Sequence, residues 1–393
     1  MGYTPHVLVV GGGVTGTGVA RDLAMRGLEV TLVEKGTLTD GTTGRMHGLL
    51  HSGARYADTN PALAEQCVRE NRVLRDIAAH CVEETGGLFV SLAGDDPDYL
   101  EQKQEACEEV GIPVERLDPA SAREYEPALA EDVEAALAVP DAAVDPFRLT
   151  VANAQSALHY GATIRTHTRV IDVLRMEDTV SGVRVREDAP GDRGHSPADV
   201  QEIEADYVVN ATGPWADKVA EKARLDVPLT RSKGAMVVQH VSALETVVNR
   251  CRPKDDGDIV VPHGEMAILG TTDEPVDDPE RFPEEDQEVD FLLDELATLV
   301  PGVADARTFR TYWGVRPLFD PEGAGAGSDP GEGGTRDVSR DYRIVDHEER
   351  DGVWGISTVV GGKFTTYRHV AEAVADHVCA KFGIDRPCRT ADV

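Results

Sequence analysis

The sequence lacks any run of 18 or more apolar residues, and its first residues pass directly into a strand-like pattern. A helix needs about 20 apolar residues to cross a bilayer, so we expect neither a transmembrane segment nor a signal peptide. Its six cysteines show none of the spacings typical of zinc or iron–sulfur ligands. We therefore expect no metal site, and cysteines that are small core residues of a reduced protein.

Positive charge is also scarce, because 39 Lys and Arg face 71 Asp and Glu for a net charge of −32. Such a charge excludes direct nucleic-acid binding, which needs a basic face. Only 8 of the cations are lysines. A strongly negative surface keeps a protein soluble under heavy salt screening. We interpret the composition as that of a cytoplasmic protein from a halophilic, archaeal-type source, in preference to an acidic binding surface.

A glycine motif stands near the N-terminus, in "VLVVGGGVTGTGVARDLAMRGLEVTLVEK", after a predicted strand and at the start of a predicted helix. Gly11 makes the tight turn, Gly13 lets a pyrophosphate approach the backbone, and Gly16 lets helix and strand pack closely. Glu34 ends the second predicted strand, where a carboxylate accepts from ribose hydroxyls. The pattern predicts a dinucleotide-binding unit whose contact residues are Gly11, Gly13, Thr15, Gly16, Glu34 and Lys35.

Two later segments favour FAD over NAD as the dinucleotide. "VVNATGPWAD" (208–217) ends a second strand in small residues, and "VVGGKFTTYR" (359–368) is a strand, a glycine turn and a helix start. The N-terminus of such a helix can stabilise a flavin's anionic reduced ring. From these segments we assign to the FAD site Ala211, Thr212, Gly213, Gly362, Lys363, Phe364 and Thr365.

Several segments together carry a family resemblance: "GRMHGLLHSGARYA", "NATGPWAD", "LGTTD", "WGVRPL", "SRDY" and "GGKFTTYR". The sequence resembles the FAD-dependent glycerol-3-phosphate dehydrogenases. "HGLLHSGARYA", "VNRCRP" and "RPCRTAD" resemble the catalytic A subunit of the anaerobic, multi-subunit enzyme in particular. Family members continue past "RPCRTAD" into a cysteine-rich domain, so we expect either a truncated chain or a form without that module.

The resemblance implies an activity, the oxidation of sn-glycerol 3-phosphate to dihydroxyacetone phosphate with hydride transfer to flavin N5. Electrons would pass towards quinone through iron–sulfur and membrane-anchor partner subunits, at the inner face of the cell membrane. It also implies an α/β fold, a glutathione-reductase-like Rossmann domain interleaved with an α+β substrate domain that carries an antiparallel sheet. The expected FAD-binding domain is 1–85, 141–225 and 339–393, and the expected substrate domain is 86–140 and 226–338.

By the same resemblance, the scarce cations converge on the substrate. Arg55, Tyr56 and Arg340 are expected to hold its phosphate, Arg316 to stabilise the developing alkoxide, and Lys363 to meet flavin N1/O2 or the phosphate.

His51 is the first candidate for general base, because histidine titrates near working pH. His47 is expected to contact the flavin rather than act as a catalyst. Thr42, Thr43 and Gly44 are expected to line the path from ribose to ring, and the Val170 backbone to bond adenine.

Some positions leave alternatives open. Met46 stands where the anaerobic enzyme usually has Asn. His240 and His263 are both candidates for the substrate-domain histidine of the aerobic enzyme, and Trp215 is interpreted as a packing residue. An arginine pair would also clamp a carboxylate, so a 2-hydroxy-acid or amino-acid oxidoreductase of the same fold is one alternative. A non-catalytic flavin-binding subunit is another.

Overall fold

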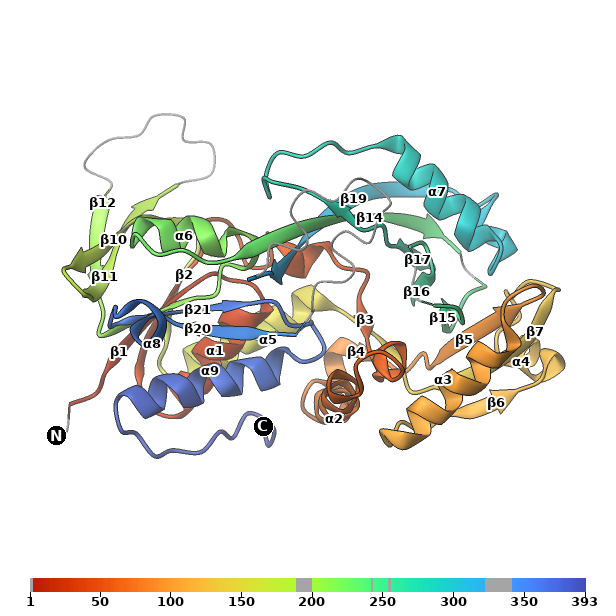
Figure 1. Ribbon diagram of the computed structural model, residues 1–393, viewed down its shortest axis with the longest axis horizontal. Helices are drawn as coiled ribbons and strands as arrows, with labels where there is room; N and C mark the ends of the chain where they lie inside the picture. The colour runs from red at the N-terminus through yellow and green to blue at the C-terminus, as the bar shows by residue number, and fades with distance from the viewer. Residues whose placement is uncertain (1–2, 189–199, 242, 254–255, 322–340) are drawn as a thin grey trace.

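The computed structural model describes residues 3–188, 200–241, 243–253, 256–321 and 341–393. Two sheets lie side by side, with a small sheet and a helix between them (Figure 1). Among the described residues, no helix combines the length and apolar character needed to span a bilayer.

The first sheet has six strands in the order β20-β21-β13-β1-β2-β9. Its centre is parallel, and β20 pairs with β21 antiparallel at one edge. The strands are β1 (His6–Val10), β2 (Glu29–Val33), β9 (Thr163–Arg165), β13 (Tyr207–Asn210), β20 (Arg343–Asp346) and β21 (Ile356–Val360).

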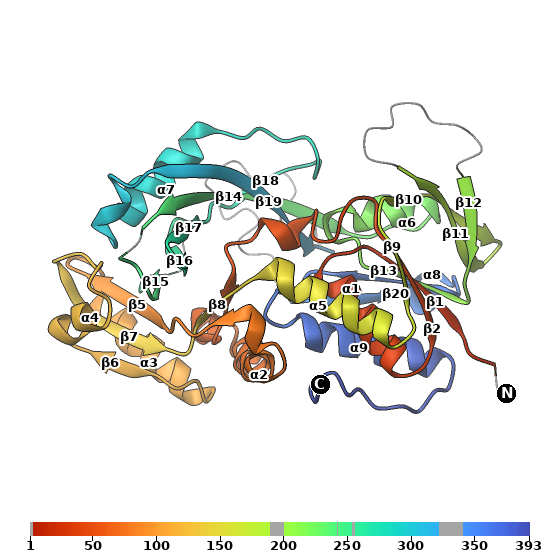
Figure 2. The ribbon, with the colours of Figure 1, turned by 180° about the vertical axis from the view of Figure 1, so that it is seen from behind.

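Both faces of this sheet are covered, which explains why β1 is almost wholly apolar. Val7 and Val9 pack towards one face, and Leu8 and Val10 towards the other. The helices α1 (Val14–Met25), α5 (Pro146–His159) and α9 (Tyr367–Lys381) cover the first face (Figure 2). The second face carries α6 (Ala216–Lys222) and the antiparallel strands β10 (Thr168–Met176), β11 (Thr179–Glu187) and β12 (Val200–Glu204). The strand-like pattern over 162–210 predicts a β-meander that leads back to a parallel strand, and the structure confirms it: β10, β11 and β12 pair in sequence, and β13 then joins the parallel sheet.

The second sheet has nine strands, eight in the order β18-β14-β17-β16-β15-β5-β7-β6, with β19 paired to β14. The helix α7 (Asp286–Ala297) packs its leucines into the core of this sheet. The strands are β5 (Gly87–Leu92), β6 (Glu115–Leu117), β7 (Val133–Val139), β14 (Leu229–His240), β15 (Val247–Arg250), β16 (Ile259–His263), β17 (Met266–Gly270), β18 (Glu274–Pro275) and β19 (Thr308–Phe319). The helices near β6 and β7 are α3 (Pro97–Glu109) and α4 (Pro119–Tyr125).

One expected helix is shorter than its sequence pattern indicates. The pattern over 62–85 predicts one helix, but α2 (Pro61–Ile77) ends eight residues earlier. Val82–Glu83 forms β4, which pairs with β8 (Ala142–Val144) beside β3 (Leu49–Leu50). This long-range pairing overrides the local helical periodicity.

The α/β fold class expected from the sequence is confirmed, with a parallel Rossmann-type sheet interleaved with a mainly antiparallel one. The domain boundaries at 85, 140, 225 and 338 stay predictions. The glycine- and proline-rich stretches 189–199 and 322–337 lie outside the described residues. A short helix, α8 (His347–Asp351), follows β20.

Candidate cofactor and substrate site

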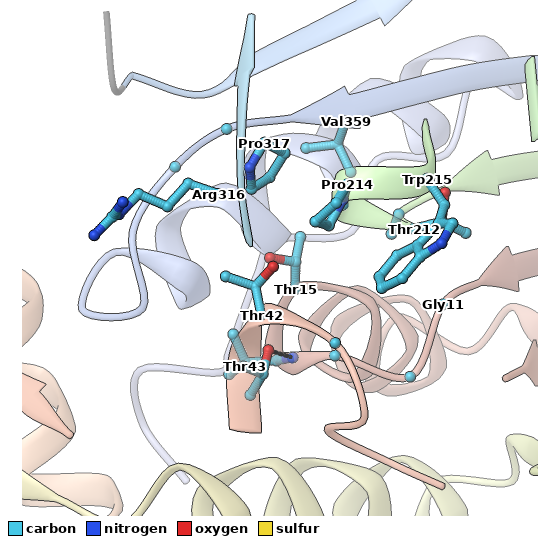
Figure 3. A pocket seen from close by; sticks show the side chains of 18 of the residues that line it. Gly11, Thr15, Thr42, Thr43, Thr212, Pro214, Trp215, Arg316, Pro317 and Val359 are labelled. Carbon is cyan, nitrogen blue, oxygen red and sulfur yellow. Dashed lines mark hydrogen bonds between the residues drawn. The ribbon is translucent and has the colours of Figure 1, made fainter. Parts of the chain in front are cut away.

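A cavity of about 470 Å³ lies where the carboxyl ends of β1, β2, β13 and β21 meet the strand β19. Ligands of open α/β sheets bind outside these strand ends. Figure 3 shows Arg316 at one end of the cavity and Trp215 at the other, with Thr15, Thr42 and Thr43 between them.

Two glycines of the N-terminal motif, Gly11 and Gly16, sit where no side chain fits. Gly11 has φ +115°, and a Cβ there would lie 2.5 Å from the carbonyl oxygen of Ala211. A Cβ on Gly16 would lie 1.9 Å from the carbonyl oxygen of Gly11. Gly11, Gly13 and Thr15 line the cavity, whereas Gly16 packs α1 against the turn behind it. The cradle therefore fits a pyrophosphate at the start of α1.

Glu34 lines the cavity at the end of β2 and is fixed by the backbone. Gly12 N–H donates to its Oε2 at 2.7 Å and Gly36 N–H to its Oε1 at 2.8 Å. Each carboxylate oxygen retains a lone pair for a ribose hydroxyl. Further assigned residues also line the cavity, among them Lys35, Val170, Ala211, Thr212, Gly213, Gly362, Lys363 and Phe364.

The path between the two ends runs along η1 (Thr42–Arg45), a 3-10 helix held to its neighbours by threonine hydroxyls. Thr42 Oγ1 donates to Val315 O at 2.5 Å, and Thr43 Oγ1 accepts from Val14 N–H at 3.1 Å. Gly44 lies outside the lining: its N–H donates to Thr39 O at 3.0 Å and closes a turn. Thr43 thus ties this wall of the cavity to the first turn of α1.

At the Arg316 end of the cavity, side chains from distant parts of the chain meet. The buried His51 ring meets the Tyr56 ring edge-on, with centroids 5.3 Å apart, and Lys363 Nζ lies 4.3 Å from the Tyr56 centroid. Thr365 lies outside the lining, and its hydroxyl accepts from His51 N–H at 3.0 Å. Thr365 therefore positions His51 rather than lining the cavity.

Arg316 comes to this end on β19, which contacts η1 and η5 (Gly213–Trp215). Its guanidinium donates to Ser232 Oγ at 3.0 Å, Thr271 Oγ1 at 2.8 Å and Thr272 O at 3.0 Å. With so many donors anchored, the side chain holds one orientation at the cavity wall.

Among the described residues, one expected phosphate ligand, Arg55, is not in the cavity lining. Arg55 Nη2 donates to both carboxylate oxygens of Asp258, at 2.8 and 2.7 Å, and Asp258 is 1% exposed. Arg340 lies outside the described residues. Of the three expected ligands, Tyr56 is the one that the described part of the chain places against the cavity.

His47 and Met46 also line this end, and His47 Nδ1 is buried without a hydrogen-bond partner among the described residues. His263 Nε2 lies 3.0 Å from His47 O, whereas His240 sits at the exposed end of β14. Of the two candidate histidines, His263 therefore borders the site. Burial and the nearby Arg55 and Arg316 charges lower the pKa of His47 from 6.5 to about 3.

A His47 ring that stays neutral should make the protein lose stability in acid. Between pH 6.5 and pH 3, the imidazole of His47 is protonated in the unfolded chain but neutral in the folded chain. The free energy of unfolding therefore falls as the pH falls. In His47→Asn, urea unfolding should show a pH slope shallower by up to about 1.4 kcal/mol per pH unit in that window. The exposed His80→Asn is the control. Equal slopes in the parent and His47→Asn would contradict the prediction.

The cavity concentrates the scarce cations of an acidic chain. Four of the eight lysines line it, together with two arginines, whereas Glu34 is the one carboxylate among its described lining residues. A polyanionic cofactor suits such a cavity. The lining cations are Lys35, Arg169, Lys218, Lys222, Arg316 and Lys363.

Sequence reasoning missed Arg169, Lys218 and Lys222. For the two lysines, the signal was the i, i+4 spacing of a rare residue type directly after "ATGPWAD". The cysteines are core residues as expected: five of the six are buried, and burial raises the pKa of Cys67, Cys107 and Cys251 to about 12.

Known proteins match the whole chain. The family model described as FAD dependent oxidoreductase matches residues 6–376. The A1 subunit of the anaerobic glycerol-3-phosphate dehydrogenase of Haloferax volcanii is 56% identical over 100% of this chain and 66% of its own length. The A subunit of the Escherichia coli enzyme is 45% identical over 98% of this chain and 69% of its own length. The chain thus spans about two thirds of the length of these relatives.

Solved structures share the fold. Glycerol-3-phosphate dehydrogenase from Bacillus halodurans complexed with FAD has a TM-score of 0.73 at 24% identity, covering 99% of this chain and 67% of its own. Glycine oxidase from Bacillus cereus has a TM-score of 0.76 at 22% identity, with 96% of each chain covered. With the glycine cradle, Glu34 at the end of β2 and the cationic cavity in place, this chain belongs to the FAD-dependent oxidoreductases and, within them, to the family of the anaerobic glycerol-3-phosphate dehydrogenase A subunits.

Proposed function

We propose that this chain oxidises sn-glycerol 3-phosphate to dihydroxyacetone phosphate as the FAD-carrying component of a larger enzyme. The observation that carries the proposal is the meeting of His51, Tyr56, Arg316 and Lys363 at one end of the FAD cavity. FAD, when bound, supplies flavin N5 as the acceptor of the C2 hydride. The substrate also loses the proton of its C2 hydroxyl, so the protein must supply a base and a group that stabilises the alkoxide.

The residues at this end divide these tasks. Arg316, anchored by its other donors, stabilises the developing alkoxide oxygen. Lys363 and Tyr56 offer a cation and a hydroxyl to the phosphate. Arg55 acts with Asp258 behind Tyr56, and Arg340 is proposed to close the phosphate site by family resemblance. His51 accepts the hydroxyl proton, because a neutral imidazole is a base near neutral pH.

The direct test is an anaerobic titration of the purified protein, in high salt, with sn-glycerol 3-phosphate. Bleaching of the flavin bands in the visible spectrum is the expected result. If the bands persist with sn-glycerol 3-phosphate but bleach with 2-hydroxy acids or amino acids, the substrate of this site is a carboxylate and the proposal is wrong. Bands that persist with every small substrate would leave a flavin-binding protein without this chemistry.

Replacing His51 tests the proposed base. His51→Ala should lower kcat more than tenfold, a loss above about 1.4 kcal/mol of transition-state stabilisation. Thr365→Ser keeps the hydroxyl that accepts from His51 N–H, so it serves as the matched control and should stay near the parent rate. Flavin reduction followed in a stopped-flow instrument measures both. A loss below tenfold in His51→Ala would assign the base to another group.

We further propose that iron–sulfur and membrane-anchor partners take the electrons towards quinone, with the enzyme peripheral at the inner face of the cell membrane. Support comes from relatives that are named A or A1 subunits, names that imply further components of the enzyme. The reduced chain should then be reoxidised quickly by quinone in the presence of host membranes and slowly by quinone alone. Equal rates under both conditions would contradict the need for partners.

A further inference from the structure

Trp215 lies at the end of the cavity opposite Arg316 (Figure 3). Two side chains from separate parts of the chain, those of Lys35 and Glu280, contact it there. Trp215 ends η5, and Lys35 follows β2. Glu280 belongs to the loop that joins β18 to α7, next to the nine-stranded sheet. Trp215 and Lys35 line the cavity, whereas Glu280 stands behind them.

The indole ring of Trp215 is held on several sides. Its Nε1 donates to Glu280 Oε1 at 2.9 Å, and the same carboxylate oxygen pairs with Lys35 Nζ. Lys35 Nζ lies 3.6 Å from the centre of the indole ring. A Cβ on Gly41 would lie 3.2 Å from Trp215 Cζ3, so the bare backbone of Gly41 completes the support. One carboxylate therefore orients two residues of the cavity wall.

The position of this wall identifies the part of FAD that it faces. Glu34, the carboxylate suited to a ribose, directly precedes Lys35. Thr15, in the first turn of α1, lies between Trp215 and Arg316 (Figure 3). The proposed base His51 and the cation Lys363 lie at the Arg316 end, so the flavin ring is assigned to that end. The adenosine half of FAD is then assigned to the Trp215 end. The pKa of Glu280 is lowered, first by its hydrogen bond with Lys35, so the carboxylate stays ionised at neutral pH.

We propose that Glu280 is a positioning residue for the adenosine half of FAD. It holds Trp215 and Lys35 in place as a wall over the adenosine and so couples the loop beside the nine-stranded sheet to cofactor retention. The ion pair is partly exposed, with side chains 28% and 54% accessible, and exposed pairs are weak. The Trp215 hydrogen bond and the orientation of its ring therefore carry most of the effect.

The test measures FAD release from purified holoprotein, as the rise in FAD fluorescence after dilution. Glu280→Ala removes both contacts and should speed release about fivefold. Glu280→Gln keeps an oxygen that can accept from Trp215 Nε1, so its release rate should lie between the parent and Glu280→Ala. Glu284→Ala, in an exposed glutamate of the same loop, is the matched control and should release FAD at the parent rate.

A second readout separates positioning from a general loosening of the fold. The visible flavin bands of Glu280→Ala at saturating FAD should match the parent, because the flavin ring lies at the other end of the cavity. Release at the parent rate in Glu280→Ala, equal acceleration in Glu284→Ala, or shifted flavin bands would each overturn the proposal. None of these readouts uses glycerol 3-phosphate, so failure here and failure of the proposed substrate are distinguishable.

Discussion

A Gly16→Ala variant should bind FAD at least about 100-fold more weakly than the parent, a loss of about 2.7 kcal/mol. The added Cβ would stand 1.9 Å from the carbonyl oxygen of Gly11, a distance that no contact between these atoms tolerates. Neither atom belongs to a flexible side chain, so α1 must move away from β1. That movement carries the N-terminal N–H groups of α1 away from the pyrophosphate. Equilibrium titration with FAD, read by flavin fluorescence, measures the loss.

Two further variants guard this prediction against simple misfolding. Gly302→Ala meets nothing within 4 Å and should bind FAD like the parent. A Cβ on Gly13 would lie 3.1 Å from the Thr43 hydroxyl, which can rotate, so Gly13→Ala should keep its thermal stability. Gly13 lines the cavity, so the methyl group of Gly13→Ala should take space from the cofactor and weaken FAD binding. Parent-like FAD affinity in both Gly13→Ala and Gly16→Ala would refute the assignment of the cradle.

An Arg316→Ala variant should lose about 10²- to 10³-fold in kcat while still binding FAD, equivalent to about 3–4 kcal/mol of transition-state stabilisation. Arg316 is held by Ser232 and Thr271, so its orientation exists before the substrate arrives. A donor fixed in this way stabilises developing negative charge without reorganisation. Anaerobic stopped-flow reduction by sn-glycerol 3-phosphate measures the rate, and the visible spectrum confirms the bound flavin.

Arg316→Lys and Arg310→Ala complete that experiment. Lysine keeps the charge but lacks the planar fork that reaches several acceptors at once, so the rate should recover only in part. Arg310 lies on the same strand with an exposed side chain, and its removal should leave the rate unchanged. Turnover of Arg316→Ala near the parent value would show that the alkoxide is stabilised elsewhere.

Patterns that are local in the sequence predicted local structure well. The motif from Gly11 to Glu34 contains both strands, the helix and the terminal carboxylate, so the cradle was readable without tertiary contacts. The predicted helix over 62–85 was wrong at its end. The helical periodicity there competes with the pairing of β4 to β8, whose residues are about 60 positions apart in the sequence.

Partner choice for charged side chains was the least predictable feature of the site. Arg55 stands in a segment of cations, yet its guanidinium turns to Asp258, which is more than 200 residues away. The sequence pattern predicts Lys218 and Lys222 as ordinary surface residues of a helix. The packing of α6 beside the strand ends is what brings them to the cavity. The partner of a charged side chain can lie anywhere in the sequence, because an ion pair depends only on the distance between the two charges in the folded chain.

The sequence by itself determined the family, the cofactor and the cradle, because glycine spacing and strand-end residues are set by backbone sterics over a few dozen residues. It also determined the overall acidity. Tertiary structure alone decided which rare cations share the cavity, that Arg55 pairs with Asp258, and that Glu280 orients Trp215 and Lys35. The cavity contacts arise where β19 and the loop before α7 pack against the first sheet, whereas the Arg55–Asp258 pair joins the segment after β3 to the residue before β16. Such packing depends on all the elements together.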